Sequence, residues 1–475
     1  MVAGGLVATA SPASAFIICA PGVNTFVWDG NANDPPGQVG DNKNLDNAYN
    51  WDVNCTPGLL NQPHDDMVTI PAGANVFINA GGSADVAAIT NNGILTVANG
   101  GALMTYGPST SNVLNLQGIL GGPGRFVVTK QLTWTSLPTG ASTQVTRRCD
   151  LVSCAAPAPV AGVTVINAGA KLLINGRGVN LSDQRIIENH GTTTVSGLGY
   201  IAADYGTAFR NVRSPGAVQP RFTFANDGGY YQGFAIAGFG LSAFSNSGLV
   251  TKTGGTATGV SVIDAQYSST DAGSTYTGTT QVKIGTLTIF TPSGNIVRTA
   301  KVQQGASFGN AAPACDPGTG VCAPIQPTGD DVQVATVQLT LAGTTSSTVT
   351  IQEVSGVPVV PGQRGLPVRF ETPTAQADTA HPLRFRILLD STLLLTGETA
   401  ASVATNGVVA RQATTSDPYV ALPNCTVTTP SVSVVACVDR ALSIAETAAL
   451  ATGDVVMVVS SLANSRYRVS KVGAA

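Results

Sequence analysis

The sequence predicts an all-β protein in which a parallel β-helix, or solenoid, is followed by an antiparallel β-sandwich. Three observations lead to this fold class. The charged fraction is too low for many exposed helices, an Asn-x-Gly pattern recurs through the first half of the chain, and apolar and polar residues alternate clearly in the last third.

The composition favours strands over helices. Charged residues make up 11% of the 475 residues, whereas ordinary soluble domains contain roughly 25%. Exposed helices rely on Glu, Lys and Arg for solubility and for pairs four residues apart. Strands need fewer charges, because Thr, Ser and Asn can occupy their solvent-facing side. The chain is also rich in Gly (54) and Pro (27), which favour turns.

The charge pattern excludes two classes of partner. The net charge is −3, and no basic run is longer than Arg147-Arg148. Binding to nucleic acid by counterion release requires a concentrated basic face, and so does polybasic membrane attachment. The longest stretch without charge, residues 228–251, is interrupted by Gly, Asn, Gln and Ser. It would leave polar groups in lipid, so no membrane span is expected.

The first residues indicate export. In "MVAGGLVATASPASAF", the small residues Ala13-Ser14-Ala15 follow a short apolar run, which is typical of the cleavage site of a secretory signal peptide. The positively charged region that usually opens such a leader is missing here. A signal peptide is therefore expected at residues 1–15 in complete or truncated form, and the protein is expected to be secreted to the cell surface.

The cysteines indicate disulfide clamps. The chain has eight, which lie as neighbours along the sequence: Cys19, Cys55, Cys149, Cys154, Cys315, Cys322, Cys425 and Cys437. No CxxC, CxxCH or zinc-type spacing is present, which argues against redox, haem and zinc sites. Many connectivities are open to eight cysteines. Among them we expect the four sequential pairs, formed in an oxidising compartment.

The Asn-x-Gly pattern marks a repeat. Its members are Asn79-Ala80-Gly81, Asn91-Asn92-Gly93, Asn167-Ala168-Gly169, Asn189-His190-Gly191, Asn226-Asp227-Gly228 and Asn246-Ser247-Gly248. The middle position varies freely, which indicates a turn, and we expect Asn and Gly around it because both tolerate positive φ. His190 is therefore interpreted as a turn residue rather than as a catalytic acid or base.

The spacing of these marks predicts the coils of a solenoid. Intervals such as 12, 22 and 20 residues separate them, which indicates a unit of roughly 20–25 residues with short strands and Gly/Asn bends. Each coil would lay its strands on those of the coil before it. The expected strands include "VTIPAGANVFI", "ILTV", "GVTVINAGAKLLI", "TTTVSGLGYIAA", "FTFA" and "TLTI".

The N-terminal motifs carry a family resemblance. "FVWDG" contains Trp28, "YNWDVNC" contains Asn50-Trp51, and "PHDDMVTIPAG" contains the run 66–71. This series resembles the opening of secreted bacterial parallel β-helix repeat proteins of the adhesin-like surface type. The resemblance covers roughly residues 26–289 and implies a fold rather than an activity. In such a cap, bulky Trp side chains and a Cys19–Cys55 clamp would close the open end of the first coil.

The last third of the chain is patterned differently. In Leu383-Arg384-Phe385-Arg386-Ile387 the apolar residues take one face and the arginines the other, as in a half-exposed strand. Several such runs predict an antiparallel sandwich, which loosely resembles the C-terminal sandwich modules of secreted actinobacterial-type surface proteins. "LSIAETAALATGD" is expected to form a short helix.

The predicted domains are a signal peptide (1–15), an N-terminal cap (16–62), a parallel β-helix (63–290), a Gly/Pro-rich connection with a disulfide (291–330) and a β-sandwich (331–475).

One segment could hold a metal. "WDGNANDPPGQVGDNKNLDN" concentrates oxygen ligands of the kind that Ca²⁺ prefers, with candidates at Asp29, Asp34, Asp41 and Asp46. The Gly and terminal Glu positions of an EF-hand are not matched. The same residues are also what a long polar loop uses for Asx-turns. Beyond this calcium hypothesis, no cofactor is expected.

A glycan-cleaving enzyme is the alternative function. Hydrolases on a β-helix need grouped carboxylates, and polygalacturonase-type enzymes carry Asn-Thr-Asp, Asp-Asp, His-Gly and Arg-x-Lys signatures. Only Asp65-Asp66 and His190-Gly191 match these letters, far apart in the sequence. Asp204, Asp227 and Asp264 are the other carboxylates considered, the first two as turn residues and the third as a lone strand-borne acid. No catalytic residue is therefore predicted.

These observations predict an extracellular structural or adhesive surface protein. Its partners would be cell-surface glycans or copies of itself, assembled into a filament or surface array through solenoid ends and sandwich edges. Tyr200, Tyr205, Tyr230 and Tyr231 are candidates for a strip on which sugar rings could stack. The alternative remains a polysaccharide hydrolase or lyase on the same scaffold.

Overall fold

A computed structural model shows the all-β fold that the sequence predicts. It describes residues 19, 24–30, 32, 34, 40–57, 65–136, 144–146, 162–204, 206–232, 242–271, 274–290, 297–303, 306–311, 334–338, 346–354, 361–372, 382–389, 391–426, 434–450 and 454–470. The chain divides into two compact units, residues 1–133 with 143–164, and residues 134–142 with 165–475. No helix in the described ranges is long and apolar enough to cross a bilayer.

The first unit is built from short parallel strands. They are β1 (Thr25–Val27), β2 (Met67–Ile70), β3 (Asn75–Ile78), β4 (Ser83–Val86), β5 (Ala88–Val97), β6 (Ala102–Thr105), β7 (Ser109–Leu116), β8 (Ile119–Gly121), β9 (Arg125–Ser136) and β10 (Gln144–Thr146), preceded by a 3-10 turn at Ala48–Asn50. One series of parallel pairs joins β1, β2, β5 and β7, and another joins β4, β6, β8 and β10. Every second residue of β2, β3 and β6 is buried, as in Val76 and Ile78 of β3.

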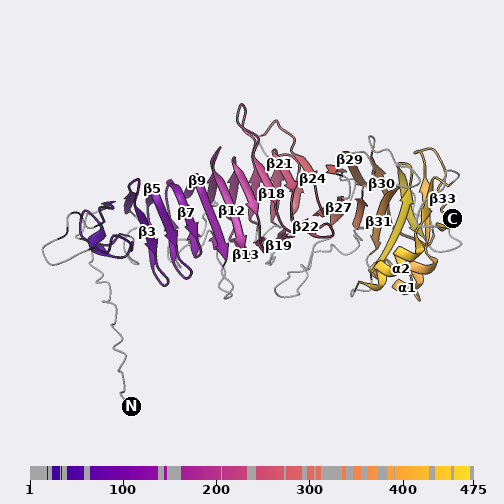
Figure 1. Ribbon diagram of the computed structural model, residues 1–475, viewed down its shortest axis with the longest axis horizontal. Helices are drawn as coiled ribbons and strands as arrows, with labels where there is room; N and C mark the ends of the chain where they lie inside the picture. The colour runs from indigo at the N-terminus through magenta and orange to yellow at the C-terminus, as the bar shows by residue number, and fades with distance from the viewer. Residues whose placement is uncertain are drawn as a thin grey trace, which may run out of the picture. The chain divides into compact units, whose positions relative to one another are not determined.

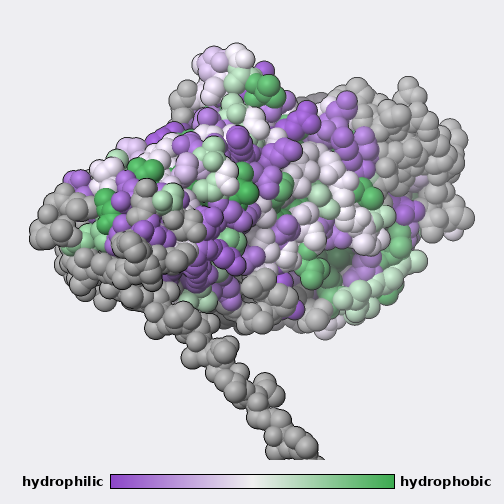
Figure 2. Space-filling view, turned by 60° about the vertical axis from the view of Figure 1, so that its left-hand side comes forward, coloured by the Kyte–Doolittle hydropathy of each residue, from purple (hydrophilic) through white to green (hydrophobic). Residues whose placement is uncertain are grey.

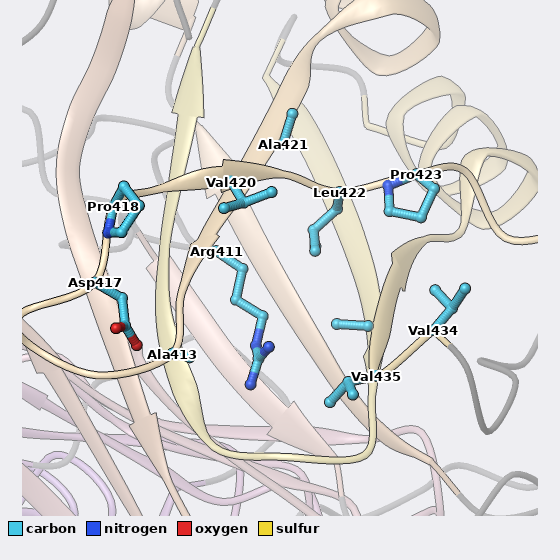
Figure 3. Close-up of a pocket in the computed structure, with 11 residues that line it drawn as sticks. Arg411, Ala413, Asp417, Pro418, Val420, Ala421, Leu422, Pro423, Val434 and Val435 are labelled. Atoms are coloured by element: carbon cyan, nitrogen blue, oxygen red, sulfur yellow. The ribbon is translucent and has the colours of Figure 1, made fainter.

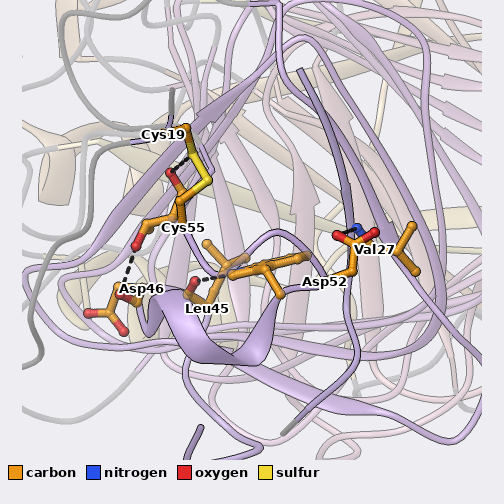
Figure 4. The surroundings of a disulfide bond; sticks show 8 residues. Cys19, Val27, Leu45, Asp46, Asp52 and Cys55 are labelled. Atoms are coloured by element: carbon orange, nitrogen blue, oxygen red, sulfur yellow. Dashed lines mark hydrogen bonds between the residues drawn. A yellow bond between two sulfur atoms is a disulfide. The ribbon is translucent and has the colours of Figure 1, made fainter. Parts of the chain in front are cut away.

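An aromatic cap closes the start of the first unit, as the sequence predicts. The ring of Trp51 meets those of Phe26 and Trp28 edge to face, at centroid distances of 6.2 and 5.2 Å. The indole Nε1 of Trp51 donates to the Leu45 carbonyl at 2.9 Å, so this buried ring leaves no unsatisfied donor. A disulfide joins Cys19 to Cys55 beside it (Figure 4).

The second unit continues the parallel pattern with three strands per coil (Figure 1). Its parallel strands are β12 (Lys171–Gly176), β13 (Gly178–Ser182), β14 (Ile186–Asn189), β15 (Thr192–Val195), β16 (Tyr200–Ala203), β17 (Ala208–Asn211), β18 (Arg221–Phe224), β19 (Tyr230–Gln232), β20 (Ala243–Asn246), β21 (Leu249–Lys252), β22 (Val260–Ile263), β23 (Gln266–Ser268), β24 (Thr279–Val282), β25 (Thr286–Phe290), β26 (Val297–Gln303) and β27 (Ser307–Ala311); β11 (Val163–Ile166) precedes them. They stack in three columns, headed by β12, β13 and β14.

The coils are longer than the sequence spacing suggests. In the column headed by β12, Lys171 is aligned with Thr192, Arg221, Leu249 and Thr279. One coil therefore takes 21 residues at first and 28 to 30 later, against the expected 20–25. The extra residues lie in loops between strands, where they leave the strand register unchanged.

A ladder of buried asparagines runs through the column headed by β14. Asn189, Asn211 and Asn246 occupy the same position on β14, β17 and β20 and are fully buried. The side-chain amide of Asn189 donates to Asn211 Oδ1, and that of Asn211 donates to Asn246 Oδ1, both at 2.8 Å. The last amide donates to the hydroxyl of Tyr267 at 3.2 Å. In the first unit, Asn91 binds Ser111 Oγ in the same way at 2.7 Å.

The ladder corrects the reason we gave for the Asn-x-Gly repeat. Neither Asn189 nor Gly191 has positive φ. Instead, Asn189 Oδ1 accepts from the Gly191 amide, and a Cβ on Gly191 would lie 2.2 Å from the carbonyl oxygen of Ala170. The glycine is thus required by the close approach of the preceding coil. Positive φ explains only repeats such as those ending at Gly81 and Gly169.

Aromatic rings fill the interior of the same coils. Phe209, Phe244 and Tyr267 are aligned on β17, β20 and β23, and their rings are stacked at centroid distances of 5.3 and 5.9 Å. Phe222 packs edge to face against Phe209 and Phe244. The core of each coil therefore depends on the coils above and below it, as in other repeat proteins.

The chain then changes from parallel to antiparallel pairing. The C-terminal elements are β28 (Val334–Gln338), β29 (Ser346–Glu353), β30 (Gln363–Glu371), β31 (Leu383–Leu389), a 3-10 turn (Ser391–Leu393), α1 (Ala400–Asn406), β32 (Val408–Gln412), β33 (Val420–Ala421), β34 (Ala436–Val438), α2 (Arg440–Ala448), β35 (Val455–Ser461) and β36 (Ser465–Ser470). One layer pairs β26, β29, β30, β36, β32 and β33, and the other pairs β27, β28, β31, β35 and β34. Phe370 and Phe385 stack between the layers at 4.4 Å.

Two features of this region bear on the sequence analysis. Strands β26 (Val297–Gln303) and β27 (Ser307–Ala311) fall within the predicted connection. Each pairs with a parallel strand on one side and with an antiparallel strand on the other. Helix α2 lies where a short helix was expected, and a second disulfide joins Cys425 to Cys437. Cys149, Cys154, Cys315 and Cys322 lie outside the described residues.

The ladder makes a specific prediction about stability. Replacing Asn211 by Ala removes one buried donor and one buried acceptor, so Asn189 and Asn246 lose partners that no solvent can replace. We expect the free energy of unfolding to fall by roughly 2–4 kcal/mol, measured by urea denaturation. The control is Asn180→Ala, on the half-exposed side of β13, which should change it by less than about 0.5 kcal/mol. Equal effects of the two substitutions would contradict the role of the ladder.

Candidate functional site

The candidate calcium ligands lie in the cap, where Asp41 and one oxygen of Asp34 accept hydrogen bonds from the protein. Asp41 accepts from the backbone amides of Lys43 and Asn44 at 3.0 and 2.9 Å and from the Asn50 amide at 2.6 Å. Although burial raises the pKa of Asp41, these hydrogen bonds lower it below its usual value. Asp34 Oδ2 accepts from the Gly40 amide at 2.5 Å. The bond from the Lys43 amide to Asp41 has the spacing of an Asx-turn, which the sequence left as the second explanation.

The other two candidates do not complete a metal centre. Burial raises the pKa of Asp46, and the nearby charge of Asp41 adds to this shift. Asp29 is half-buried in the same cap. No group of three or more His, Cys, Asp or Glu side chains in the described part of the chain is arranged to hold a metal ion. The calcium hypothesis therefore stays a prediction without geometric support.

The most concentrated group of ionisable side chains lies on the outer side of the β14 column. Arg210 on β17 donates to Glu188 on β14 at 2.7 Å and to both oxygens of Asp271 at 2.8 and 2.6 Å. Ser245, aligned with Arg210 on β20, donates to Asp271 at 2.6 Å. The cluster thus joins consecutive coils through one guanidinium.

His190 lies at the margin of this cluster. Its Nε2 is 3.9 Å from Glu188 Oε2, and its Nδ1 is 3.3 Å from Ser214 Oγ. The side chain is 22% exposed and belongs to the bend after β14, as the turn interpretation predicts. Of the residues in the cluster, the sequence analysis singled out His190 alone. The missed signal was the interval of 22 residues between Glu188 and Arg210, which equals that between Asn189 and Asn211.

The geometry makes this cluster a clamp between coils. The hydrogen bonds to Asp271 and its charge, together with that of Glu188, raise the pKa of Arg210 despite its partial burial. The side chain of Asp271 is 2% exposed, so its charge depends on Arg210 for compensation. Both carboxylates bind one guanidinium, which groups two acids around Arg210.

The other carboxylates considered from the sequence are dispersed. Asp65 is exposed and Asp66 is buried before β2, in the first unit. Asp204 lies in the turn after β16. Asp264 follows β22 and is 2% exposed, so this strand-borne acid belongs to the interior of the coils rather than to an open face.

Asp227 is a turn residue, as predicted, and compensates a buried cation. Lys252 is fully buried at the end of β21, and its Nζ donates to Asp227 Oδ1 at 2.9 Å and to the Asn226 carbonyl at 2.8 Å. The Thr256 amide donates to the second oxygen of Asp227 at 3.0 Å. Burial raises the pKa of Asp227, but the bonds to Lys252 and Thr256 lower it below its ordinary value overall.

The tyrosines do not form the predicted strip. Tyr230 is fully buried, and burial raises its pKa well above the usual value, which favours the neutral phenol. Tyr200 and Tyr231 meet edge to face at 5.6 Å on neighbouring coils and are half-buried. Tyr205 lies outside the described residues. An exposed surface for sugar stacking at this place is therefore limited to one pair of rings.

A groove opens at the free edges of the two C-terminal layers (Figure 3). It has a volume of about 520 Å³ and lies between β33 and β34. Val420 is 62% exposed and Val435 39% exposed on its walls, and the Arg411 side chain points into it. The lining of the groove is largely apolar, with one cation, Arg411, and one carboxylate, Asp417, which accepts hydrogen bonds from Thr414.

Comparison of the chain with models of protein families, with curated proteins and with solved structures finds no match. The assignment of a function therefore depends on the geometry of the described residues.

The clamp predicts a large effect of losing the guanidinium. Arg210→Gln should lower the free energy of unfolding by roughly 2–4 kcal/mol, because Asp271 would remain buried without its cation. Thermal or urea unfolding measures this loss. Arg221→Gln, which removes an exposed charge from β18, is the matched control and should change stability by less than about 0.5 kcal/mol. A loss no greater than the control's would show that Arg210 does not hold the coils together.

The Lys252–Asp227 pair predicts a pH dependence. Since the pKa of Asp227 is lower in the folded chain than in the unfolded one, its stabilisation is complete above the unfolded value of about 3.8. It is lost as pH falls through the folded value. We expect wild-type stability to fall more steeply below about pH 4 than that of Asp227→Asn, which should be less stable at pH 7. Parallel acid limbs of the two curves, obtained by thermal unfolding across pH, would contradict this assignment.

Proposed function

We propose that this protein is an extracellular structural or adhesive surface protein. The observation that carries the proposal is an aligned row of polar side chains on the stacked coils. The row consists of Thr194, Thr223, Thr251 and Gln281 on β15, β18, β21 and β24, with neighbouring strands about 4.8 Å apart. Thr194, Thr223 and Gln281 are half-buried and face outward, whereas Thr251 is buried. Such a row offers repeated hydrogen-bonding groups to an extended partner.

The character of the surface supports this function. On the face shown in Figure 2, hydrophilic residues form broad bands and hydrophobic residues are scattered between them. With few charges in the chain as a whole, such a surface interacts mainly through hydrogen bonds and shape. The ionisable groups of the Arg210 cluster and of the Lys252–Asp227 ion pair bind one coil to the next. Such contacts suit a rigid scaffold.

The disulfides support an extracellular location. Cys19–Cys55 and Cys425–Cys437 lie in the cap and beside the C-terminal edge strands, and such bonds persist in oxidising compartments. This agrees with the leader expected at residues 1–15, and secretion to the cell surface is part of the proposal.

Self-assembly into a filament or array is the second element of the proposal. A heterologous contact between the two ends of the chain would produce a filament if it does not close. The strand edges at the C-terminal end are the short β33 and β34, and the exposed Val420 and Val435 lie next to them. These apolar side chains favour association there.

A glycan-cleaving enzyme is a second candidate because of one specific observation. Glu188 and Asp271 bind the same guanidinium, so two carboxylates are grouped at one place on the coils, and glycosidases act through such a pair. Against this function, both oxygens of Asp271 are engaged by Arg210, and its side chain is 2% exposed. Substrate would not reach that acid without breaking the clamp.

Binding and cleavage assays on one polysaccharide panel distinguish the two functions. For the adhesive function we expect saturable binding of the full chain to at least one cell-surface polysaccharide, with no release of reducing ends or unsaturated products. Electron microscopy at high protein concentration should show filaments or arrays. Cleavage that Glu188→Gln abolishes without unfolding the chain would establish the enzyme instead. The absence of both binding and assembly would contradict the adhesive function.

A further inference from the structure

A row of cationic and amide side chains crosses four antiparallel strands near the C-terminus. The strand register places Gln352 of β29 opposite Arg369 of β30, which lies opposite Arg466 of β36, which lies opposite Gln412 of β32. Arg369 and Arg466 point to the outer side of this layer, since the residues that alternate with them, Phe370 and Tyr467, are fully buried in the core.

The two arginines in this row are not balanced by acids. Like charges directly opposite each other on neighbouring strands are destabilising. Arg369 forms an ion pair with Glu371 of its own strand. Arg466 has no carboxylate partner among the described residues. Two arginines that lie directly opposite each other on neighbouring strands thus have one carboxylate partner between them, that of Arg369.

A third arginine extends this face. Arg468, two residues beyond Arg466 on β36, is 8% exposed, and its guanidinium lies 4.3 Å from the ring centre of Tyr419. Its Nε is buried without a hydrogen-bond partner among the described residues. The charges of Arg466 and Arg468 both act on the Tyr419 hydroxyl, so the three side chains are close neighbours. A buried donor without a partner is costly unless a ligand satisfies it.

A polar hollow lies beside this row. It has a volume of about 300 Å³, and its lining includes Arg369, Arg466, Thr414 and Asn464, with Glu371 as its acid. The Gln412 amide holds the loop on one side of the hollow by donating to the carbonyl of Asp417 at 2.7 Å. Hydroxyl, amide and guanidinium donors therefore converge on one small space.

We propose that Arg369, Arg466 and Arg468 form a binding site for the carboxylate or sulfate groups of an acidic polysaccharide. This inference rests on the proposed adhesive function and names its partner class. The planar guanidinium group donates two parallel hydrogen bonds to such anions. Hydroxyl and amide donors in the hollow match the sugar hydroxyls next to the charged group. Nucleic acid is a poor fit, because the chain has a net charge of −3 and three arginines do not make an extended basic track.

Binding of two acidic probes tests the site. Polygalacturonate carries carboxylates and dextran sulfate carries sulfates, and unmodified dextran serves as the neutral comparison. For the full-length wild type we expect saturable binding to at least one acidic probe, weakening as salt is added. Arg466→Gln should weaken it by roughly tenfold or more, because a charge-assisted hydrogen-bonding group is lost. Arg221→Gln, which removes the same charge from an exposed site on β18, should bind like the wild type.

Thermal unfolding separates binding from a structural role. Since Arg466 faces a like charge, Arg466→Gln should melt at the same temperature as the wild type or higher in the absence of ligand. A lower melting temperature together with weaker binding would indicate a structural residue and overturn the proposal.

The remaining outcomes distinguish this proposal from the proposed function. Equal binding of acidic probes by the wild type, Arg466→Gln and Arg221→Gln would place the anion site elsewhere and leave adhesion intact. Binding of neutral polysaccharides alone would also overturn the acidic site and leave adhesion intact. Binding of none of the panel would contradict both.

Discussion

The structure depends on burying the polar ends of short strands inside stacked coils. Each coil turns sharply after a strand such as β14, and the turn would leave amide groups without water. The buried asparagines solve this problem, because Asn189 and Asn246 accept from the glycine amides of their own turns, and Asn189 and Asn211 donate to the next coil. The same residue therefore satisfies a bend and fixes the register of its neighbour.

Once the register is fixed, other side chains can act across coils. Phe209, Phe244 and Tyr267 stack because they occupy one aligned position, and Arg210 reaches Glu188 for the same reason. The clamp encloses acids that resemble part of a hydrolase site, but their pairing serves cohesion between coils. A surface built in this way presents aligned polar rows, and the arginine face near the C-terminus adds charge where the pairing has become antiparallel.

Much of the fold could be predicted from the sequence. The Asn-x-Gly rhythm indicated stacked coils, the tryptophans at 28 and 51 indicated a cap, and neighbouring cysteines gave the two pairs that the described residues contain. The role of each asparagine could not be predicted, because the same Asn-x-Gly sequence is expected from a simple turn and from a ladder of buried amides. The Arg210 cluster was also missed, because Asp271 is 61 residues away in sequence. The facing arginines depend on antiparallel register, which a bulge between Arg364 and Val368 shifts by an amount that pattern alone does not give.

The central claim is that neighbouring coils are coupled through buried side-chain amides, and a double-mutant cycle between Asn189 and Asn211 tests it most directly. Their hydrogen bond is 2.8 Å long and fully buried. Unfolding free energies of the wild type, Asn189→Ala, Asn211→Ala and the double variant should give a coupling energy of about 1 kcal/mol or more. If the two single effects add to within roughly 0.3–0.5 kcal/mol, the asparagines act independently and the coils are held in register by something else.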